Sequence, residues 1–162
     1  MIPDEELYRR WLSGDEEGLR ALMERYGDRL TLYLDGYVRD LHEGEDLMIE
    51  AFAWIIAKRP AIRAGGFRAY LFQAGRRMAL RQAKKRRSRP CFSLEELERE
   101  PESALLVEEL HGPYREALFL VYFEGLSHRE AAAVLKKSEK QVAELIYRGK
   151  NALRKRLEEE GI

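Results

Sequence analysis

The sequence has a single cysteine, Cys91, and its three histidines, His42, His111 and His128, lie far apart. One cysteine excludes an internal disulfide, and scattered histidines lack metal-ligand spacing, so we expect neither a metal site nor another cofactor. No apolar run is long enough to span a bilayer and no signal peptide is recognisable, which predicts a cytoplasmic protein. No activated nucleophile or phosphate-binding loop is evident either, so an enzyme is the least favoured class.

Glycine and proline are also scarce, with 12 and 5 residues among 162, whereas charged residues make up 36% of the chain. This composition is typical of helix-rich proteins. Apolar residues recur at helical spacing, and no stretch alternates as a strand would. The pattern predicts helices over residues 4–12, 45–58 and 67–87, one long or broken helix over 15–39, and a further helical stretch from near Tyr114 to Gly125.

The residues from Ser88 to Pro113 have the composition of a linker, because they combine three prolines with a dense acidic run. A capping box at Ser93 and Glu96 predicts a short helix within it. We therefore expect an all-α chain of two small helical domains, 1–90 and 113–162, joined by an acidic linker at 91–112. The second is expected to be a helix-turn-helix domain of three to four helices, similar to a winged helix.

The net charge of zero conceals strong segregation of charge along the chain. Residues 63–90 carry ten Lys and Arg and no Asp or Glu, whereas residues 1–62 and 91–113 each carry a net charge of −6. A basic block on a helix is a candidate nucleic-acid surface, because neutralising phosphates releases counterions. The alternative is a solvated face that the acidic segments of the fold balance.

Residues 126–157 form the most informative stretch of the sequence. Ser127 with Glu130, and Ser138 with Gln141, have the spacing of two capping boxes, which predicts two helices separated by a short turn. The small apolar residues between the caps allow close helix packing, as in a helix-turn-helix that places its second helix in the DNA major groove. The alternative is an ordinary helical hairpin with a solvated charged face.

The second of these helices has two distinct faces at 100° per residue. The residues expected to face the core are Val142, Ile146, Gly149, Leu153 and Leu157. The outward residues are Lys140, Glu144, Tyr147, Arg148 and Asn151, with Gln141 at the edge. Lys140 and Arg148 suit phosphates, Gln141 or Asn151 suits adenine, and Glu144 would be repelled by phosphates but can accept from cytosine N4.

Four segments in order resemble the bacterial sigma-70 family, specifically its extracytoplasmic-function group, which has only regions 2 and 4. The segments LMERYGDRLTLYL, EGEDLMIEAFAWI and GFRAYLFQAGRRMALRQAKKRR are similar to region 2. Residues from Tyr114 to Leu157 are similar to region 4, including the string EGLSHREAAAVL. The resemblance covers nearly the whole chain.

The resemblance implies an alternative sigma factor with core RNA polymerase, promoter DNA and an anti-sigma factor as partners. For polymerase it implies Glu45, Asp46, Ile49 and Glu50. For the −10 element it implies Arg68, Tyr70, Arg76, Arg77, Arg81, Lys84, Lys85 and Arg86. For the −35 element it implies Ser127, Ser138, Lys140, Gln141, Glu144, Tyr147, Arg148 and Lys150. Tyr70 and Phe72 would either stack on unpaired bases or lie in the core.

Several residues depart from the family pattern. Ile49 stands where the family commonly has Gln, and Ala143, Glu144 and Leu145 replace residues of the usual recognition helix. Lys136 occupies a turn position that is usually Gly, at a cost of up to about 1 kcal/mol if its φ is positive. These departures keep open a degenerate sigma-like regulator that acts through protein contacts with polymerase or an anti-sigma partner. A helix-turn-helix repressor or activator indifferent to polymerase is the third alternative.

Overall fold

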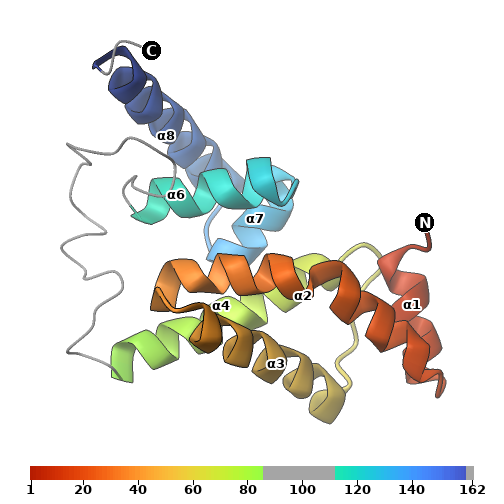
Figure 1. Ribbon diagram of the computed structural model, residues 1–162. Coiled ribbons are helices and arrows are strands. Elements are labelled where there is room, and N and C mark those ends of the chain that lie inside the picture. The colour runs from red at the N-terminus through yellow and green to blue at the C-terminus, as the bar shows by residue number, and fades with distance from the viewer. Residues whose placement is uncertain (86–111, 160–162) are drawn as a thin grey trace. The chain divides into compact units, whose positions relative to one another are not determined.

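The part of the chain that the structure describes is entirely helical. The computed structural model describes residues 1–85 and 112–159, and no strand occurs within them. The chain divides into two compact units, Met1–Cys91 and Phe92–Ile162 (Figure 1). The predicted all-α class with two small helical domains is thereby confirmed. Arg86, the capping box at Ser93 and the expected linker up to residue 111 lie outside the described residues.

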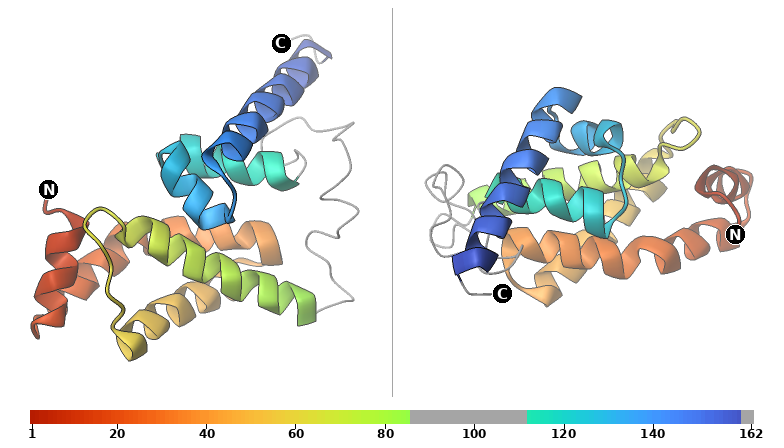
Figure 2. Two further views of the ribbon diagram at one scale, coloured as in Figure 1. Left: turned by 180° about the vertical axis from the view of Figure 1, so that it is seen from behind. Right: turned by 90° about the horizontal axis from the view of Figure 1, so that it is seen from above.

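Residues 1–85 of the first unit form four helices, of which the second packs against each of the other three. They are α1 (Asp4–Leu12), α2 (Glu16–Val38), α3 (Leu41–Lys58) and α4 (Phe67–Lys85). In Figures 1 and 2, α3 and α4 lie beside α2, and α1 lies at the N-terminal end of α2. The long pattern predicted over 15–39 is therefore a single helix, and its N-terminus is capped by the Asp15 side chain.

The first helix is held closely against α2. A Cβ atom at Gly18 would lie 2.2 Å from the backbone oxygen of Leu7, so only glycine permits this approach. The Asp4 carboxylate accepts hydrogen bonds from the Arg25 guanidinium and from the Tyr26 hydroxyl, both at 2.5 Å. Burial, reinforced by the bond to Asp4, raises the pKa of Tyr26, so its hydroxyl remains a donor at neutral pH.

Aromatic rings fill the core between α2 and α4. The Tyr33 and Phe72 ring centroids lie 5.4 Å apart, and those of Tyr26 and Phe67 lie 6.2 Å apart. Phe72 is completely buried, so of the two alternatives for this residue the core position is the correct one. Because large aromatic side chains dominate core energetics, these contacts fix which side of α4 faces solvent.

The third helix begins four residues earlier than the sequence pattern predicts, at Leu41 instead of Glu45. The cause is Asp40, whose carboxylate accepts hydrogen bonds from the backbone N–H groups of His42, at 2.9 Å, and Glu43, at 3.3 Å. An Asp N-cap satisfies amide groups that the helix itself leaves without partners. The predicted end at Lys58 is confirmed, with Arg59 as a left-handed C-cap.

The second unit contains α6 (Gly112–Leu118), a π-helical turn η2 (Phe119–Phe123), α7 (His128–Leu135) and α8 (Glu139–Glu159). The helical stretch predicted from near Tyr114 starts at Gly112, and Gly125 follows its end with φ +70°. A Cβ atom at Gly149 of α8 would lie 3.0 Å from Leu118 Cδ1 and 3.3 Å from Tyr114 Cβ, both in α6. The close packing of α6 and α8 leaves the opposite side of α8 exposed.

Membrane-spanning helices and clustered metal ligands are both absent from the described part of the chain. Within residues 1–85 and 112–159, no helix combines the length and apolar character needed to cross a bilayer. In that part of the chain no three His, Cys, Asp or Glu side chains are grouped as metal ligands would be.

Candidate nucleic-acid interfaces

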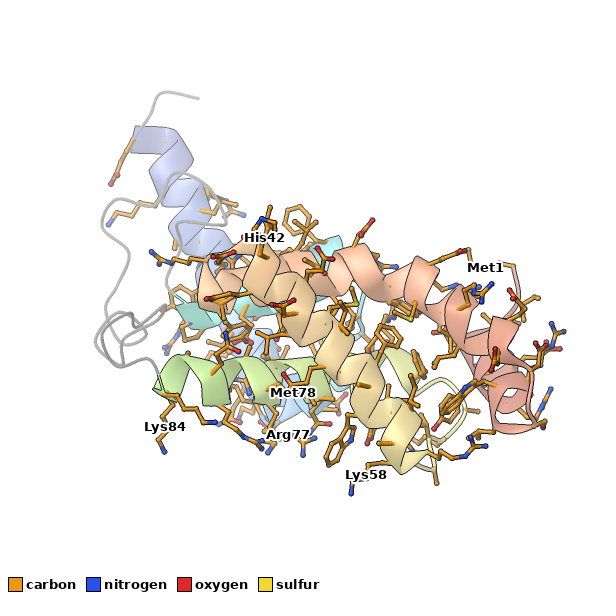
Figure 3. All side chains as sticks on the ribbon, turned by 60° about the horizontal axis from the view of Figure 1, so that its bottom comes forward. Met1, His42, Lys58, Arg77, Met78 and Lys84 are labelled. Carbon is orange, nitrogen blue, oxygen red and sulfur yellow. The ribbon has the colours of Figure 1, made fainter. Side chains whose placement is uncertain are left out.

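Three exposed cations lie on one face of α4. Arg77, Arg81 and Lys84 follow each other at spacings of four and three residues, which places them on the same side of a helix. Figure 3 shows the labelled Arg77 and Lys84 projecting from the side of α4 that faces away from α2. Lys85 is also exposed and borders this side. These four residues are called the basic face of α4.

Two of the predicted arginines lie off the basic face. Arg76 is half-buried, and its Nε donates a hydrogen bond of 3.1 Å to the Tyr37 hydroxyl of α2. Arg68 is also half-buried, and its charge acts on the Tyr26 hydroxyl. Both side chains therefore connect α4 to α2, an arrangement that the run of basic residues in the sequence does not reveal.

An exposed tryptophan lies beside Tyr70. Trp54 of α3 is 39% exposed, and its Nε1 donates a hydrogen bond of 3.2 Å to the Tyr70 hydroxyl. The Lys58 Nζ lies 5.3 Å from the centroid of the Trp54 ring, a cation–π contact. Sequence reasoning missed Trp54, although its position four residues before Lys58 on a helix was a usable signal. Tyr70 thus belongs to an aromatic pair with a cation, at the crossing of α3 and α4.

The side chains predicted to contact polymerase are exposed on α3. Glu45, Asp46 and Glu50 are exposed, and Ile49, which is 49% exposed, lies among them. Ile56 is exposed two turns after Ile49 on the same side of the helix, and these five residues are called the exposed stripe of α3. Glu50 also lines a shallow hollow between α3 and α4 together with Arg81 and Lys85. The resulting surface has an apolar centre and an acidic margin.

Both predicted capping boxes of the helix-turn-helix are present and confirmed. Ser127 Oγ accepts from the Glu130 N–H at 3.0 Å, and Glu130 Oε1 accepts from the Ser127 N–H at 3.1 Å. Ser138 Oγ accepts from the Gln141 N–H at 3.1 Å, and Gln141 Oε1 accepts from the Ser138 N–H at 2.8 Å. Gln141 therefore uses its carbonyl oxygen in the cap, whereas a bidentate contact to adenine needs both ends of the amide.

The turn between α7 and α8 contains a lysine in the left-handed region. Lys136 has φ +55° and ψ +46°, and its N–H donates to the backbone oxygen of Ala132. The Lys137 N–H donates to the same oxygen at 3.0 Å. The positive φ on which the predicted cost depended is therefore observed at Lys136, where the family commonly has glycine.

The outer face of α8 is exposed, as predicted. Val142, Ile146 and Gly149 are buried and Leu153 is half-buried, while the side chain of Leu157 is outside the described set. The exposed residues are Lys140, Gln141, Glu144, Tyr147, Arg148, Lys150 and Asn151. Among them, Glu144 Oε1 and Arg148 Nη2 form an ion pair at 2.7 Å, and Lys150 Nζ lies 5.0 Å from the ring centroid of Tyr122.

Comparisons with known proteins relate the second unit to a family and the whole chain to a fold. Residues 104–153 match the family model described as sigma-70, region 4. The fold is similar to that of the sigma factor RpoE in complex with the anti-sigma factor NepR from Bartonella quintana. The TM-score is 0.67 and the identity 18%, over 86% of this chain and 96% of that chain. No curated protein sequence gives a significant match.

Two further solved structures share the fold. CnrH in complex with the cytosolic domain of CnrY has a TM-score of 0.71 and 23% identity, over 96% of this chain and 97% of that chain. The anti-anti-sigma factor PhyR complexed with the anti-sigma factor NepR from Bartonella quintana has a TM-score of 0.52 and 14% identity. That match covers 82% of this chain and 48% of the other. Residues 104–153 therefore match sigma-70 region 4, and the chain as a whole has the fold of these solved structures.

Proposed function

We propose that the chain is an alternative sigma factor, which binds core RNA polymerase and directs it to promoters. The observation that carries this proposal is the capped helix-turn-helix of residues 127–159. Its second helix has an exposed outer face, and the region 4 match covers that helix as far as residue 153. In such a motif the second helix enters the major groove, and its N-terminal residues contact base edges. Its proposed target is the −35 element.

The first unit supplies the surface proposed for the −10 element. Opened DNA needs cations along the backbone and flat rings for unstacked bases. The basic face of α4 provides the cations, and the Trp54–Tyr70 pair provides rings at the crossing of α3 and α4. In this role the protein holds and melts DNA and carries out no covalent chemistry.

The exposed stripe on α3 is the proposed contact with core polymerase. An apolar centre at Ile49 with acidic residues around it matches the anatomy of a protein interface, in which a dry core is surrounded by a polar rim. We also propose an anti-sigma factor as a partner, because the similar RpoE structure is a complex with one.

Run-off transcription tests the proposal. Core polymerase with the full-length protein is incubated with fragments of the native genome, and transcripts are compared with those from core polymerase alone. We expect discrete start sites that appear only when the protein is added. Transcription indistinguishable from that of core polymerase alone would reject the proposal.

A second candidate is a sigma-like regulator that binds polymerase or an anti-sigma factor without initiating transcription. Two observations favour it: the anionic Glu144 on the outer face of α8, and the fold shared with the anti-anti-sigma factor PhyR. Pull-down of the full-length protein from its native cell distinguishes the two candidates when read beside the run-off assay. Co-purification of polymerase or an anti-sigma factor without any specific transcript would favour this candidate.

A further inference from the structure

An acceptor and a donor lie side by side on the outer face of α8. Glu144 and Arg148 are one helical turn apart, with 2.7 Å between Glu144 Oε1 and Arg148 Nη2. Their side chains are 54% and 60% exposed, so both remain accessible to a ligand. An exposed ion pair of this kind contributes little to stability, so stability alone does not explain its place on the outer face.

Neighbouring polar groups on the same helix have other partners in the structure. Gln141 Oε1 accepts from the Ser138 N–H in the capping box, and Lys150 lies over the Tyr122 ring. A carboxylate is also unsuited to a phosphate, which would repel it. The Glu144 carboxylate in turn holds the Arg148 guanidinium near the middle of the outer face.

We infer that Glu144 and Arg148 together read one C·G base pair in the major groove, an inference that rests on the proposed function. Cytosine presents its N4 amino group as a donor, which a Glu accepts, and guanine presents O6 and N7 as acceptors, which an Arg contacts. Within the base pair, N4 and O6 are joined by an N–H···O bond, whose usual length is about 2.9 Å. Glu144 Oε1 and Arg148 Nη2 are 2.7 Å apart, so the acceptor and the donor have nearly the same spacing as the N4 and O6 atoms that they would contact.

Arg148 and Glu144 have enough hydrogen-bonding groups to keep their ion pair and to contact the two bases at the same time. A guanidinium has five N–H groups, so Arg148 can keep its bond to Glu144 while donating to guanine. Glu144 Oε1 likewise has a second lone pair, which can accept from cytosine N4. Glu144 thereby becomes a specificity-determining residue, and the most unusual residue of the outer face has a defined role.

The test uses full-length protein assembled with core polymerase. Holoenzyme is incubated with duplexes randomised across the upstream promoter region, and the bound fraction is sequenced. For the native protein we expect one position to prefer C·G by roughly 5- to 100-fold, the usual effect of a single mismatched base pair. Glu144→Ala and Arg148→Ala should each remove the preference at that same position. Glu144→Gln should shift it towards adenine, the base that Gln reads.

Lys140→Ala is the matched control on the same face. As a predicted phosphate contact, it should weaken binding to all sequences alike and lower the slope of log affinity against log salt by about 1. An unchanged sequence preference in Glu144→Ala, or a uniform loss of affinity in Arg148→Ala, would overturn the inference while leaving the sigma factor proposal intact. No enriched sequence with the native holoenzyme would reject both. Circular dichroism of each variant checks that the helices are retained.

Discussion

At the scale of single residues, the turn after α7 offers a stabilising substitution. Lys136 has φ +55°, a conformation that costs a residue with a side chain about 1–2 kcal/mol. Glycine adopts this conformation without strain, but it loses more conformational entropy on folding, which offsets part of the stabilisation. Lys136→Gly should therefore raise the free energy of unfolding by up to about 1 kcal/mol. Urea denaturation of the full-length protein, with amide hydrogen exchange of α7 and α8, measures the change.

The neighbouring lysine provides the control for this prediction. Lys137 is not among the residues with positive φ, so Lys137→Gly gains no conformational relief and should be neutral or destabilising. Equal stabilisation by both substitutions would mean that charge, and not backbone conformation, is responsible.

Single residues were predictable where their partners are close in sequence. The boxes at Ser127 and Ser138 follow from a three-residue spacing, and the sequence states that spacing directly. The hydrogen bond from Trp54 to Tyr70 spans sixteen residues and depends on how α3 crosses α4. Local spacing carries no information about such a crossing, so Tyr70 was identified as a candidate while Trp54 was missed.

At the scale of helices, the attachment of α1 depends on one glycine. A Cβ atom at Gly18 would lie 2.2 Å from the Leu7 oxygen and 2.9 Å from the Trp11 nitrogen, both of which are backbone atoms that cannot rotate away. Gly18→Ala should therefore push α1 from α2 and destabilise the first unit by about 1–3 kcal/mol. Thermal denaturation and the fluorescence of the buried Trp11 report the effect.

Another glycine of α2 supplies a matched control. A Cβ atom at Gly27 would meet only the end of the Met48 side chain, at 3.8 Å, which is ordinary contact. Gly27→Ala should be neutral or stabilising by up to about 1 kcal/mol, because alanine favours the helix. Destabilisation of the same size at both positions would contradict the specific role of Gly18.

The helices themselves were largely predictable, because apolar spacing and caps are local features. Their predicted bounds differ where a cap was overlooked, as at Asp40, which starts α3 four residues early. The role of each cation was less predictable. Arg76 and Arg77 are adjacent in the sequence, yet only Arg76 reaches Tyr37, because 100° of rotation separates them on the helix. Which side of α4 packs on α2 is decided by tertiary contacts.

At the scale of the whole molecule, the exposed stripe of α3 should determine binding to polymerase. Ile49→Lys places a charge at the apolar centre of this stripe, where burying it without a partner is costly. Affinity for core polymerase should fall at least about fivefold, as for a residue that contributes ~1 kcal/mol to an interface. Co-purification and a titration of labelled protein with core enzyme measure this. Leu32→Lys, at a residue of α2 that is 54% exposed, is the control and should bind normally.

Promoter opening should depend on the basic face of α4 separately from polymerase binding. Arg81→Glu combined with Lys84→Glu reverses two exposed cations, so the backbone of the opened strand would meet repulsion. Permanganate footprinting should then show no melted −10 region, while the variant still co-purifies with core polymerase. Arg9→Glu with Arg20→Glu makes the same change in net charge on exposed residues of α1 and α2, and should leave opening intact. Equal loss of promoter opening in both double variants would indicate long-range repulsion. Unchanged opening in Arg81→Glu with Lys84→Glu would mean that the basic face of α4 is only a solvated surface.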